Sequence, residues 1–278
     1  MRLLAHLSDL HFGRVDQTIV RALVAKLHEV NPDIVVVSGD LTQRARESEF
    51  REAQAFLAAL GRPQIIVPGN HDLPLYNVLA RWLTPFGRYR RYICDDLEPF
   101  YIDAEIAIAG INSARANTFK NGRISPEQIR RIRLKIDAYG AAMTQIVVIH
   151  HPFHAQEGGD RSSLIRRAPM AMEAFARIKV DLILSGHLHR STVADGAEQY
   201  GGYGRPVLLV QAGTAISTRR RGELNAFNLI HVDFPQIRIE RLEWSEKNES
   251  FAISHSDEFF RQGDVWSRFA HGDQVVGA

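Results

Sequence analysis

Histidine, aspartate and asparagine recur in five short clusters within the first two-thirds of the chain. The clusters are Asp9-Leu10-His11, Gly39-Asp40, Gly69-Asn70-His71-Asp72, His150-His151 and Gly186-His187-Leu188-His189. Imidazole, carboxylate and amide groups form a ligand set of intermediate hardness, which suits manganese, iron or zinc better than calcium. The side chains that we predict to bind metal are Asp9, His11, Asp40, Asn70, His150, His187 and His189.

These predicted ligands are too many for a single ion of ordinary coordination number. We therefore expect two ions, divalent or of mixed valence, bridged by one carboxylate at the roughly 3.5–4 Å separation of two-metal hydrolytic sites. Two carboxylates leave about half of the metal charge uncompensated, so the site attracts phosphate oxygens. The predicted reaction is hydrolysis of a phosphoester by in-line attack of a hydroxide that bridges the ions.

Each cluster directly follows a short apolar run that is typical of a buried strand. These runs are Leu3–Leu7, Ile34–Val37, Ile65–Val67, Ile146–Ile149 and Leu182–Leu184. Because ligands of open α/β sheets bind beyond the carboxyl ends of strands, we expect all five clusters to meet at one edge. In Asp9-x-His11 and His187-x-His189, an extended backbone would direct both side chains to one side. One such cluster is common by chance, whereas five at the same edge are not.

Helical patterns separate these strands and predict a mixed α/β fold. The expected helices are Thr18–Val30, Glu47–Leu60, Pro126 to about Tyr139, and Pro169–Ile178. Residues Asp72–Phe86 should form a loop and a helix. Further strands are expected at Phe100–Asp103, Glu105–Ile111, Thr192–Ala194, Val207–Gln211, Ala226–Val232 and Ile237–Leu242. We expect two packed sheets in a single domain over residues 1–245, followed by a C-terminal extension, 246–278, without an assigned structure.

Composition excludes several classes of protein. The 278 residues include 34 basic and 32 acidic side chains, which is too even a balance to indicate nucleic-acid or membrane binding. Cys94 is the only cysteine, so an intrachain disulfide and a cysteine-rich zinc site are impossible. No apolar run reaches the roughly 18 residues of a membrane span, and the first residues lack the pattern of a secretory signal. We therefore expect a cytoplasmic protein.

The order of the five clusters resembles that of the calcineurin-like metallophosphoesterase superfamily. The clusters extend from residue 9 to residue 189, about two-thirds of the chain. Within the superfamily, the chain looks most like the class III cyclic-nucleotide phosphodiesterase branch. Gly122-Arg123-Ile124-Ser125, the helix expected from Pro126, and His150-His151-Pro152 carry that second resemblance.

The resemblance implies a four-layer αββα sandwich of two mixed sheets flanked by helices. It also implies which ligands share an ion. The first ion would be held by Asp9, His11 and His189. The second would be held by Asn70, His150 and His187, with Asp40 bridging both. His71 would be catalytic: it would contact the phosphate and assist the leaving group without binding metal.

A phosphodiesterase is our leading interpretation, with a small phosphoester such as a cyclic or other small nucleotide as substrate. A phosphomonoesterase, a nuclease and a nucleotide pyrophosphohydrolase remain open on the same site. One related pyrophosphohydrolase of the lipid A pathway typically carries arginine where this chain has His71, which argues against it. The non-enzymatic alternative is a metal-bound interaction scaffold, and the intact ligand set argues against that. A homodimer is left open.

Other polar residues are not expected to bind metal or substrate directly. Arg219-Arg220-Arg221 is expected to be a solvated basic turn rather than an anion-binding segment. Asp72 is expected to orient its neighbours, because metal-binding imidazoles need hydrogen-bond acceptors behind them. Position alone does not decide whether His151 supports the site.

Overall fold

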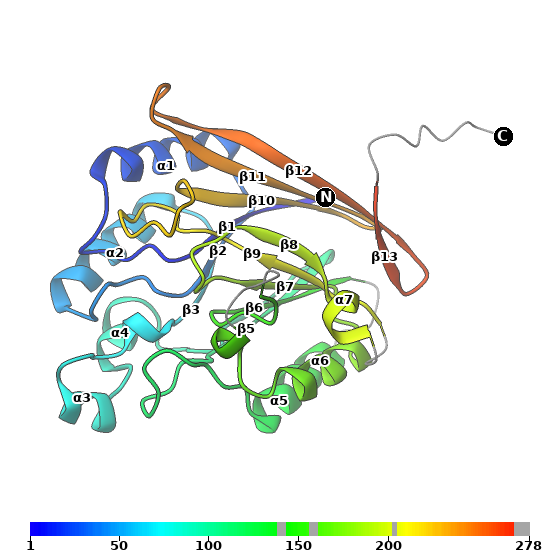
Figure 1. The fold of residues 1–278 in the computed structure, drawn as a ribbon, viewed down its shortest axis with the longest axis horizontal. Coiled ribbons are helices and arrows are strands. Elements are labelled where there is room, and N and C mark those ends of the chain that lie inside the picture. Colours follow the sequence, from blue (N-terminus) through cyan, green and yellow to red (C-terminus); the bar gives the residue numbers. More distant parts are fainter. Residues whose placement is uncertain (138–142, 156–160, 202–204, 270–278) are drawn as a thin grey trace.

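The computed structural model describes residues 1–137, 143–155, 161–201 and 205–269, which form two β-sheets packed face to face (Figure 1). Among these residues, the first sheet has seven strands in the order β13-β12-β11-β10-β1-β2-β3. Their bounds are β1 Arg2–Leu7, β2 Ile34–Ser38, β3 Gln64–Val67, β10 Ala226–Asp233, β11 Gln236–Ser245, β12 Ser250–Gln262 and β13 Val265–Arg268. Strands β1, β2 and β3 are parallel, whereas β10 is antiparallel to β1.

The second sheet has the order β4-β5-β6-β7-β9-β8. Its strands are β4 Phe100–Ile102, β5 Ile106–Ile111, β6 Thr144–Ile149, β7 Leu182–Ser185, β8 Thr192–Asp195 and β9 Leu208–Gln211. The four central strands β5, β6, β7 and β9 are parallel, and the edge strands β4 and β8 are antiparallel to their neighbours. The strand positions confirm the expectations from the apolar runs.

Helices cover the outer face of each sheet (Figure 1). Helices α1 (Gln17–Val30) and α2 (Glu47–Leu60) pack on the first sheet, and α5 (Pro126–Asp137) and α6 (Ala168–Arg177) on the second. The shorter helices are η1 Asn70–Asp72, α3 Val78–Leu83, α4 Gly87–Tyr92, η2 Arg161–Ser163 and α7 Gly196–Tyr200. The layers follow the order helix, sheet, sheet, helix, which confirms the predicted αββα sandwich.

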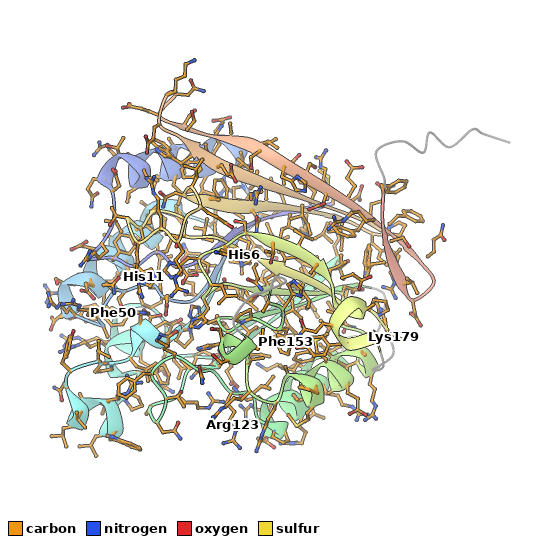
Figure 2. All side chains as sticks on the ribbon, viewed as in Figure 1. His6, His11, Phe50, Arg123, Phe153 and Lys179 are labelled. Atoms are coloured by element: carbon orange, nitrogen blue, oxygen red, sulfur yellow. The ribbon has the colours of Figure 1, made fainter. Side chains whose placement is uncertain are left out.

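Three apolar clusters hold the layers together. The inner faces of the two sheets bury Val36 against residues such as Val148 and Leu184. Phe50 belongs to the cluster between the first sheet and its helices, and Phe153 to the cluster on the second sheet (Figure 2). The strands β2, β6 and β7 are buried along their whole length, as parallel strands covered on both faces must be.

Local sequence explains where the long helices begin and end. The Asp16 side chain accepts a hydrogen bond from the Thr18 N–H at 2.8 Å, which caps α1. Asn31 ends that helix at φ 51°, and Gly61 ends α2 at φ 60°. At the start of α5, Ser125 and Gln128 exchange backbone and side-chain hydrogen bonds in a capping box. The predicted end of α5 at Tyr139 lies outside the described residues.

The C-terminal segment adds strands that sequence analysis left without an assignment. Residues Ser250–Gln262 form β12, which pairs antiparallel with β11, and Val265–Arg268 form β13. The predicted boundary after residue 245 therefore falls at the hairpin between β11 and β12. The middle of β12, residues 252–256, is exposed, so its sequence lacks the alternation of a half-buried strand. Helix α4 was also not predicted. None of the helices described is long and apolar enough to cross a membrane.

Candidate metal centre

The five polar clusters meet at one edge of the sandwich, as predicted, because the loops after β1, β2, β3, β6 and β7 contact one another. The Asp9 N–H donates to the Gly39 carbonyl at 3.1 Å, and the Gly186 N–H donates to the His150 carbonyl at 3.1 Å. These backbone hydrogen bonds fix one loop against the next within each sheet.

The backbone at these positions is not extended, so that part of the prediction is wrong. The φ angle is 51° at Asp9, 49° at His11, 73° at His187 and 58° at His189. Asp40 has a φ angle of 54°. Left-handed backbone at a residue other than glycine costs about 1–3 kcal/mol and persists only where surrounding contacts enforce it. The side chains after β1, β2 and β7 are therefore directed by strained turns, which the sequence spacing does not reveal.

Asp9, His11 and His189 form the first group of side chains that could hold an ion. The Nε2 atoms of the two histidines lie 3.1 Å apart, and Asp9 Oδ1 lies 3.6 Å and 3.3 Å from them. Ligands bound at about 2.1 Å around one ion lie roughly 3–3.5 Å from each other, so the spacing fits a metal. Asp9 Oδ1 is buried and has no hydrogen-bond partner among the described residues.

The tautomers of these two histidines follow from the backbone. The Nδ1 of His11 donates to the Thr42 carbonyl at 3.3 Å, and the Nδ1 of His189 donates to the Arg219 carbonyl at 2.8 Å. Because a carbonyl oxygen only accepts, each neutral ring keeps its hydrogen on Nδ1 and presents a lone pair at Nε2. Two lone pairs and a carboxylate oxygen face each other, an arrangement that a cation stabilises.

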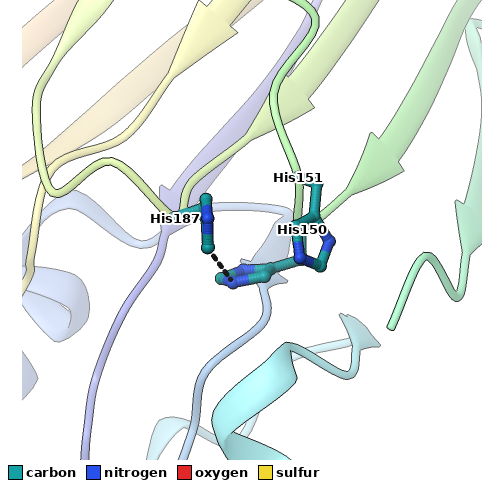
Figure 3. A group of neighbouring side chains, drawn as sticks. All are labelled: His150, His151 and His187. Carbon is teal, nitrogen blue, oxygen red and sulfur yellow. Dashed lines mark hydrogen bonds between the residues drawn. The ribbon is translucent and has the colours of Figure 1, made fainter. Parts of the chain in front are cut away.

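A second group surrounds His150. Its Nε2 lies 3.2 Å from Asn70 Oδ1, 3.2 Å from His187 Nδ1 and 3.3 Å from Asp40 Oδ2. Figure 3 shows the His187 ring directed at this nitrogen. The Nδ1 of His150 donates to the Ser38 carbonyl at 2.8 Å, so Nε2 is again the atom left for a ligand. The four atoms that the resemblance assigns to the second ion therefore lie together.

Asp40 lies between the two groups. Its Oδ2 is 3.3 Å from His150 Nε2 and 3.9 Å from His11 Nε2, and its Oδ1 accepts the His71 N–H at 2.8 Å. A Cβ atom at Gly69 would lie 2.1 Å from Asp40 Oδ1, so only glycine fits beside this carboxylate. Asp40 Oδ2 thus lies near both groups, and its role as a bridging ligand stays a prediction.

Burial and mutual contact set the charge of the site in the absence of metal. Burial opposes charge on Asp40, but the His150 ring outweighs it and holds the pKa of Asp40 well below its ordinary range. Burial also opposes a charged His150, yet Asp40 raises the pKa of His150 to about 9. Burial lowers the pKa of His11 and of His187 to about 3. A metal must therefore displace a proton from His150 when it binds.

Asp72 supports the ligands without lining the cavity. It accepts hydrogen bonds from the N–H groups of Gly69 at 2.9 Å, Thr42 at 2.9 Å and Leu41 at 3.3 Å. The loop after β3 is thereby fixed to the loop after β2. Burial, with the Asp40 charge second, raises the pKa of Asp72 to about 7. These contacts agree with the expected orienting role.

His151 is next to the predicted ligands, but both of its ring nitrogens are occupied. Its Nε2 donates to the Lys120 carbonyl at 2.7 Å, and its Nδ1 lies 2.7 Å from Ser113 Oγ. Figure 3 shows His151 beside His150 and His187. Its Nε2 carries the hydrogen, and its Nδ1 is hydrogen-bonded to a hydroxyl. His151 therefore fixes the backbone at Lys120 and has no free nitrogen for an ion.

His71 lies at the edge of the site and does not join either group. Its ring is 4.9 Å from that of His11, centroid to centroid. The Nδ1 of His71 donates to the Gln43 carbonyl at 2.8 Å, and its Nε2 accepts an N–H from the guanidinium of Arg219 at 2.9 Å. Arg220 and Arg221 are exposed, as expected of a solvated turn, whereas Arg219 is half-buried and bonded to His71.

A cavity of about 440 Å³ opens over these side chains. Its described lining includes Asp40, Asn70, His71, His187 and His189 from the predicted site, together with Lys120, Asn121, Ala155, Ser162, Ser163, Leu188, Arg190, Thr192, Gln211, Arg219 and Arg221. The volume is within the usual range for a small-molecule site. The sequence shows the arginines, but the fold alone decides that Arg190, Arg219 and Arg221 line this cavity.

The calcineurin-like phosphoesterase profile matches residues 3–191, which contain all five polar clusters. The chain belongs to this family. Its resemblance to the calcineurin-like phosphoesterases and to their class III phosphodiesterase branch is thus confirmed, since several curated relatives bear phosphodiesterase names.

Two of those relatives are named for the hydrolysis of different phosphodiesters. A glycerophosphodiester phosphodiesterase of Enterobacter lignolyticus is 28% identical over 69% of this calcineurin-like chain and 72% of its own length. A 3',5'-cyclic adenosine monophosphate phosphodiesterase of Escherichia coli K12 is 23% identical over 64% of this chain and 62% of its own length. Both proteins are named for diester hydrolysis.

Solved structures support the fold of this calcineurin-like chain. A dimetal phosphatase from Danio rerio superposes with a TM-score of 0.65 at 12% identity, covering 86% of this chain and 95% of its own. A purple acid phosphatase from yellow lupin gives a TM-score of 0.69 at 13% identity, covering 94% of this chain and 54% of its own. At such low identity these matches establish the sandwich architecture alone.

Proposed function

We propose that the protein is a binuclear metal-dependent phosphodiesterase that hydrolyses a small diester, with nucleotides among the candidate substrates. The observation that carries this proposal is the convergence of nitrogen and oxygen atoms in two groups, around Asp9 and around His150, in which neighbouring atoms lie 3.1–3.6 Å apart. The phosphodiesterase names of the relatives favour a diester over a monoester.

The donor atoms fit the ligand assignment that the family resemblance implies. Asp9, His11 and His189 would hold one ion. Asn70, His150 and His187 would hold the other, and Asp40 would bridge them. Such a pair of ions supplies Lewis-acid stabilisation of phosphate charge and lowers the pKa of bound water. Manganese, iron and zinc all suit this mixture of imidazole, carboxylate and amide groups.

His71 and Arg219 supply the protein's own part of the reaction. The Gln43 carbonyl fixes the hydrogen of His71 on Nδ1, so its Nε2 faces the cavity. Arg219 now donates to that nitrogen. When a phosphate enters, its oxygens offer the guanidinium a stronger, charged acceptor. Arg219 would then bind the phosphate, and the released His71 Nε2 would take up a proton from solvent. The resulting imidazolium would donate a hydrogen bond, and then that proton, to the leaving oxygen.

Hydrolysis of aryl phosphates tests the proposal. Protein stripped with a chelator and reloaded with Mn²⁺ should hydrolyse bis(4-nitrophenyl) phosphate faster than 4-nitrophenyl phosphate. Asp40→Ala should lose both bound metal and turnover, since the bridging carboxylate is missing. Faster hydrolysis of the monoester would replace the diester assignment. Full metal occupancy without turnover of any phosphoester would instead favour a binding scaffold.

A further inference from the structure

The cavity wall beyond the predicted metal ligands is strongly cationic. Lys120, Arg190, Arg219 and Arg221 line it, and Asp40 is the sole carboxylate in its described lining. Within the part of the chain that the structure describes, Lys120, Arg219 and Arg221 form no ion pair with a carboxylate. Their charge is therefore available to a ligand.

Two residues of the arginine segment line the cavity. Arg219 and Arg221 line the cavity, whereas Arg220 between them pairs with Glu246 at 3.3 Å. This alternation is what successive side chains of an irregular extended segment produce. The Arg219 carbonyl accepts His189 Nδ1, and Glu223 accepts the Ser191 N–H at 2.9 Å. The segment is thus fixed to the loop that carries Arg190.

Lys120 is held in place from the other side of the cavity. Its carbonyl accepts the Nε2 hydrogen of the buried His151 at 2.7 Å. A Cβ atom at Gly122 would lie 2.3 Å from the His151 ring, so the loop packs directly on this imidazole. The backbone that presents the lysine is therefore anchored, although its side chain is exposed.

The positive charges at the cavity exceed the number needed to balance the charge of a simple phosphodiester. A phosphodiester carries one negative charge, and two divalent ions held by two carboxylates already leave a surplus of about two positive charges. Lys120 and Arg221 lie on the wall outside the ligand groups and add to this surplus. A substrate that balances the wall must bring a second anionic group of its own.

We propose that Lys120 and Arg221 form a subsite for a second phosphate, so that the substrate is a phosphodiester bearing a further phosphate group. This inference rests on the proposed phosphodiesterase function. The described lining has no phenylalanine, tyrosine or tryptophan on which a base would stack, and only Ala155 and Leu188 are apolar. Recognition therefore depends on the phosphates more than on a nucleobase.

Calorimetric titration of the Mn²⁺-loaded protein tests the subsite without turnover. Thymidine 3',5'-bisphosphate should bind about tenfold tighter than thymidine 5'-monophosphate, because charge-assisted hydrogen bonds reach the added phosphate. Arg221→Ala and Lys120→Met should each remove most of that advantage. Arg220→Ala is the matched control, since Arg220 pairs with Glu246, and it should keep the full advantage. Equal affinity of the two ligands for the wild type, or equal losses in Arg220→Ala and Arg221→Ala, would overturn the subsite.

Measurements of turnover test the second-phosphate subsite separately from the proposed phosphodiesterase function. The 4-nitrophenyl ester of thymidine 5'-monophosphate should be hydrolysed, and its 3'-phosphorylated form should show a higher kcat/KM. Hydrolysis of both esters at one kcat/KM would refute the second-phosphate subsite and leave the phosphodiesterase. Tight bisphosphate binding without hydrolysis of either ester would refute the phosphodiesterase and leave a phosphate-binding site.

Discussion

At the scale of single residues, backbone carbonyls decide which histidine atoms face the site. His11, His150 and His189 each donate from Nδ1 to a carbonyl, and His71 does the same toward Gln43. In every case Nε2 is the atom left for an ion or a substrate. Such hydrogen bonds orient metal-binding imidazoles and raise their basicity.

Arg219 is the residue whose proposed role in phosphate binding comes from the structure, because its guanidinium contacts His71. Arg219→Ala should lower kcat/KM for bis(4-nitrophenyl) phosphate about a hundredfold, as the loss of one donor to a developing phosphate charge does. Arg219→Lys should recover part of it, because a lysine keeps the charge but not the forked geometry. Steady-state kinetics would measure both changes.

Arg220→Ala serves as the control for this pair of variants, because Arg220 is exposed and pairs with Glu246. It should retain nearly all activity. Unchanged kinetics in Arg219→Ala would show that the contact with His71 is structural only.

At the scale of elements, parallel strands bring the polar clusters to one edge of the sandwich. The antiparallel strands β10 to β13 complete the first sheet beside β1. Strands β12 and β13 bury Phe251, Phe259 and Trp266, each no more than 3% exposed. Each such side chain stabilises the fold by about 1.5–3 kcal/mol. Together they contribute a large share of the roughly 5–15 kcal/mol of a typical domain.

A chain truncated after Ser245 tests whether the last strands are dispensable. It keeps every predicted metal ligand but loses β12 and β13, and it leaves β11 as an unpaired edge. We expect it to be insoluble or to lack a cooperative thermal transition. A chain ending at Phe269 keeps both strands and should behave like the full chain. A folded, metal-binding protein ending at Ser245 would show that residues 246–278 form a separate extension.

At the scale of the whole molecule, the candidate metal centre joins the two sheets. The loops after β1, β2 and β3 bring Asp9, Asp40 and Asn70 from the first sheet. The loops after β6 and β7 bring His150 and His187 from the second. Ions held by both sets would connect the halves of the sandwich. Metal binding should therefore stabilise the fold as well as promote hydrolysis.

Removal of metal by a chelator should lower the melting temperature by roughly 5–10 °C, since a tightly bound ion contributes a few kcal/mol. Added Mn²⁺ should restore it. Asp40→Ala should respond much less to either treatment, because the carboxylate between the two groups is absent. Differential scanning calorimetry with parallel metal analysis would measure this. Equal melting temperatures for metal-loaded and stripped protein would contradict a centre that ties the sheets.

Several expectations about the whole protein stay predictions. The metals, a cytoplasmic location and a homodimer are among them. The substrate also stays a prediction. The positive charges of the cavity wall bear most directly on how many phosphate groups the substrate carries.

The sequence by itself predicted the candidate ligands and determined the edge of the sandwich at which those side chains meet. Polar clusters directly follow buried apolar runs, and parallel strands carry their ends to one edge regardless of detail. The long helices were equally predictable, because caps such as Asp16 and Gly61 act locally. These features depend on neighbours in the chain, which the sequence displays.

Only the tertiary structure decided which of the polar neighbours act together. The left-handed turns at Asp9 and His187 are enforced by contacts between loops, so spacing alone suggested extended backbone. Arg219 meets His71 across 148 positions of the chain. Strand β12 owes its formation to pairing with β11 and β13 and not to its own pattern. Long-range contacts of this kind depend on the closed fold and leave no periodic trace in the sequence.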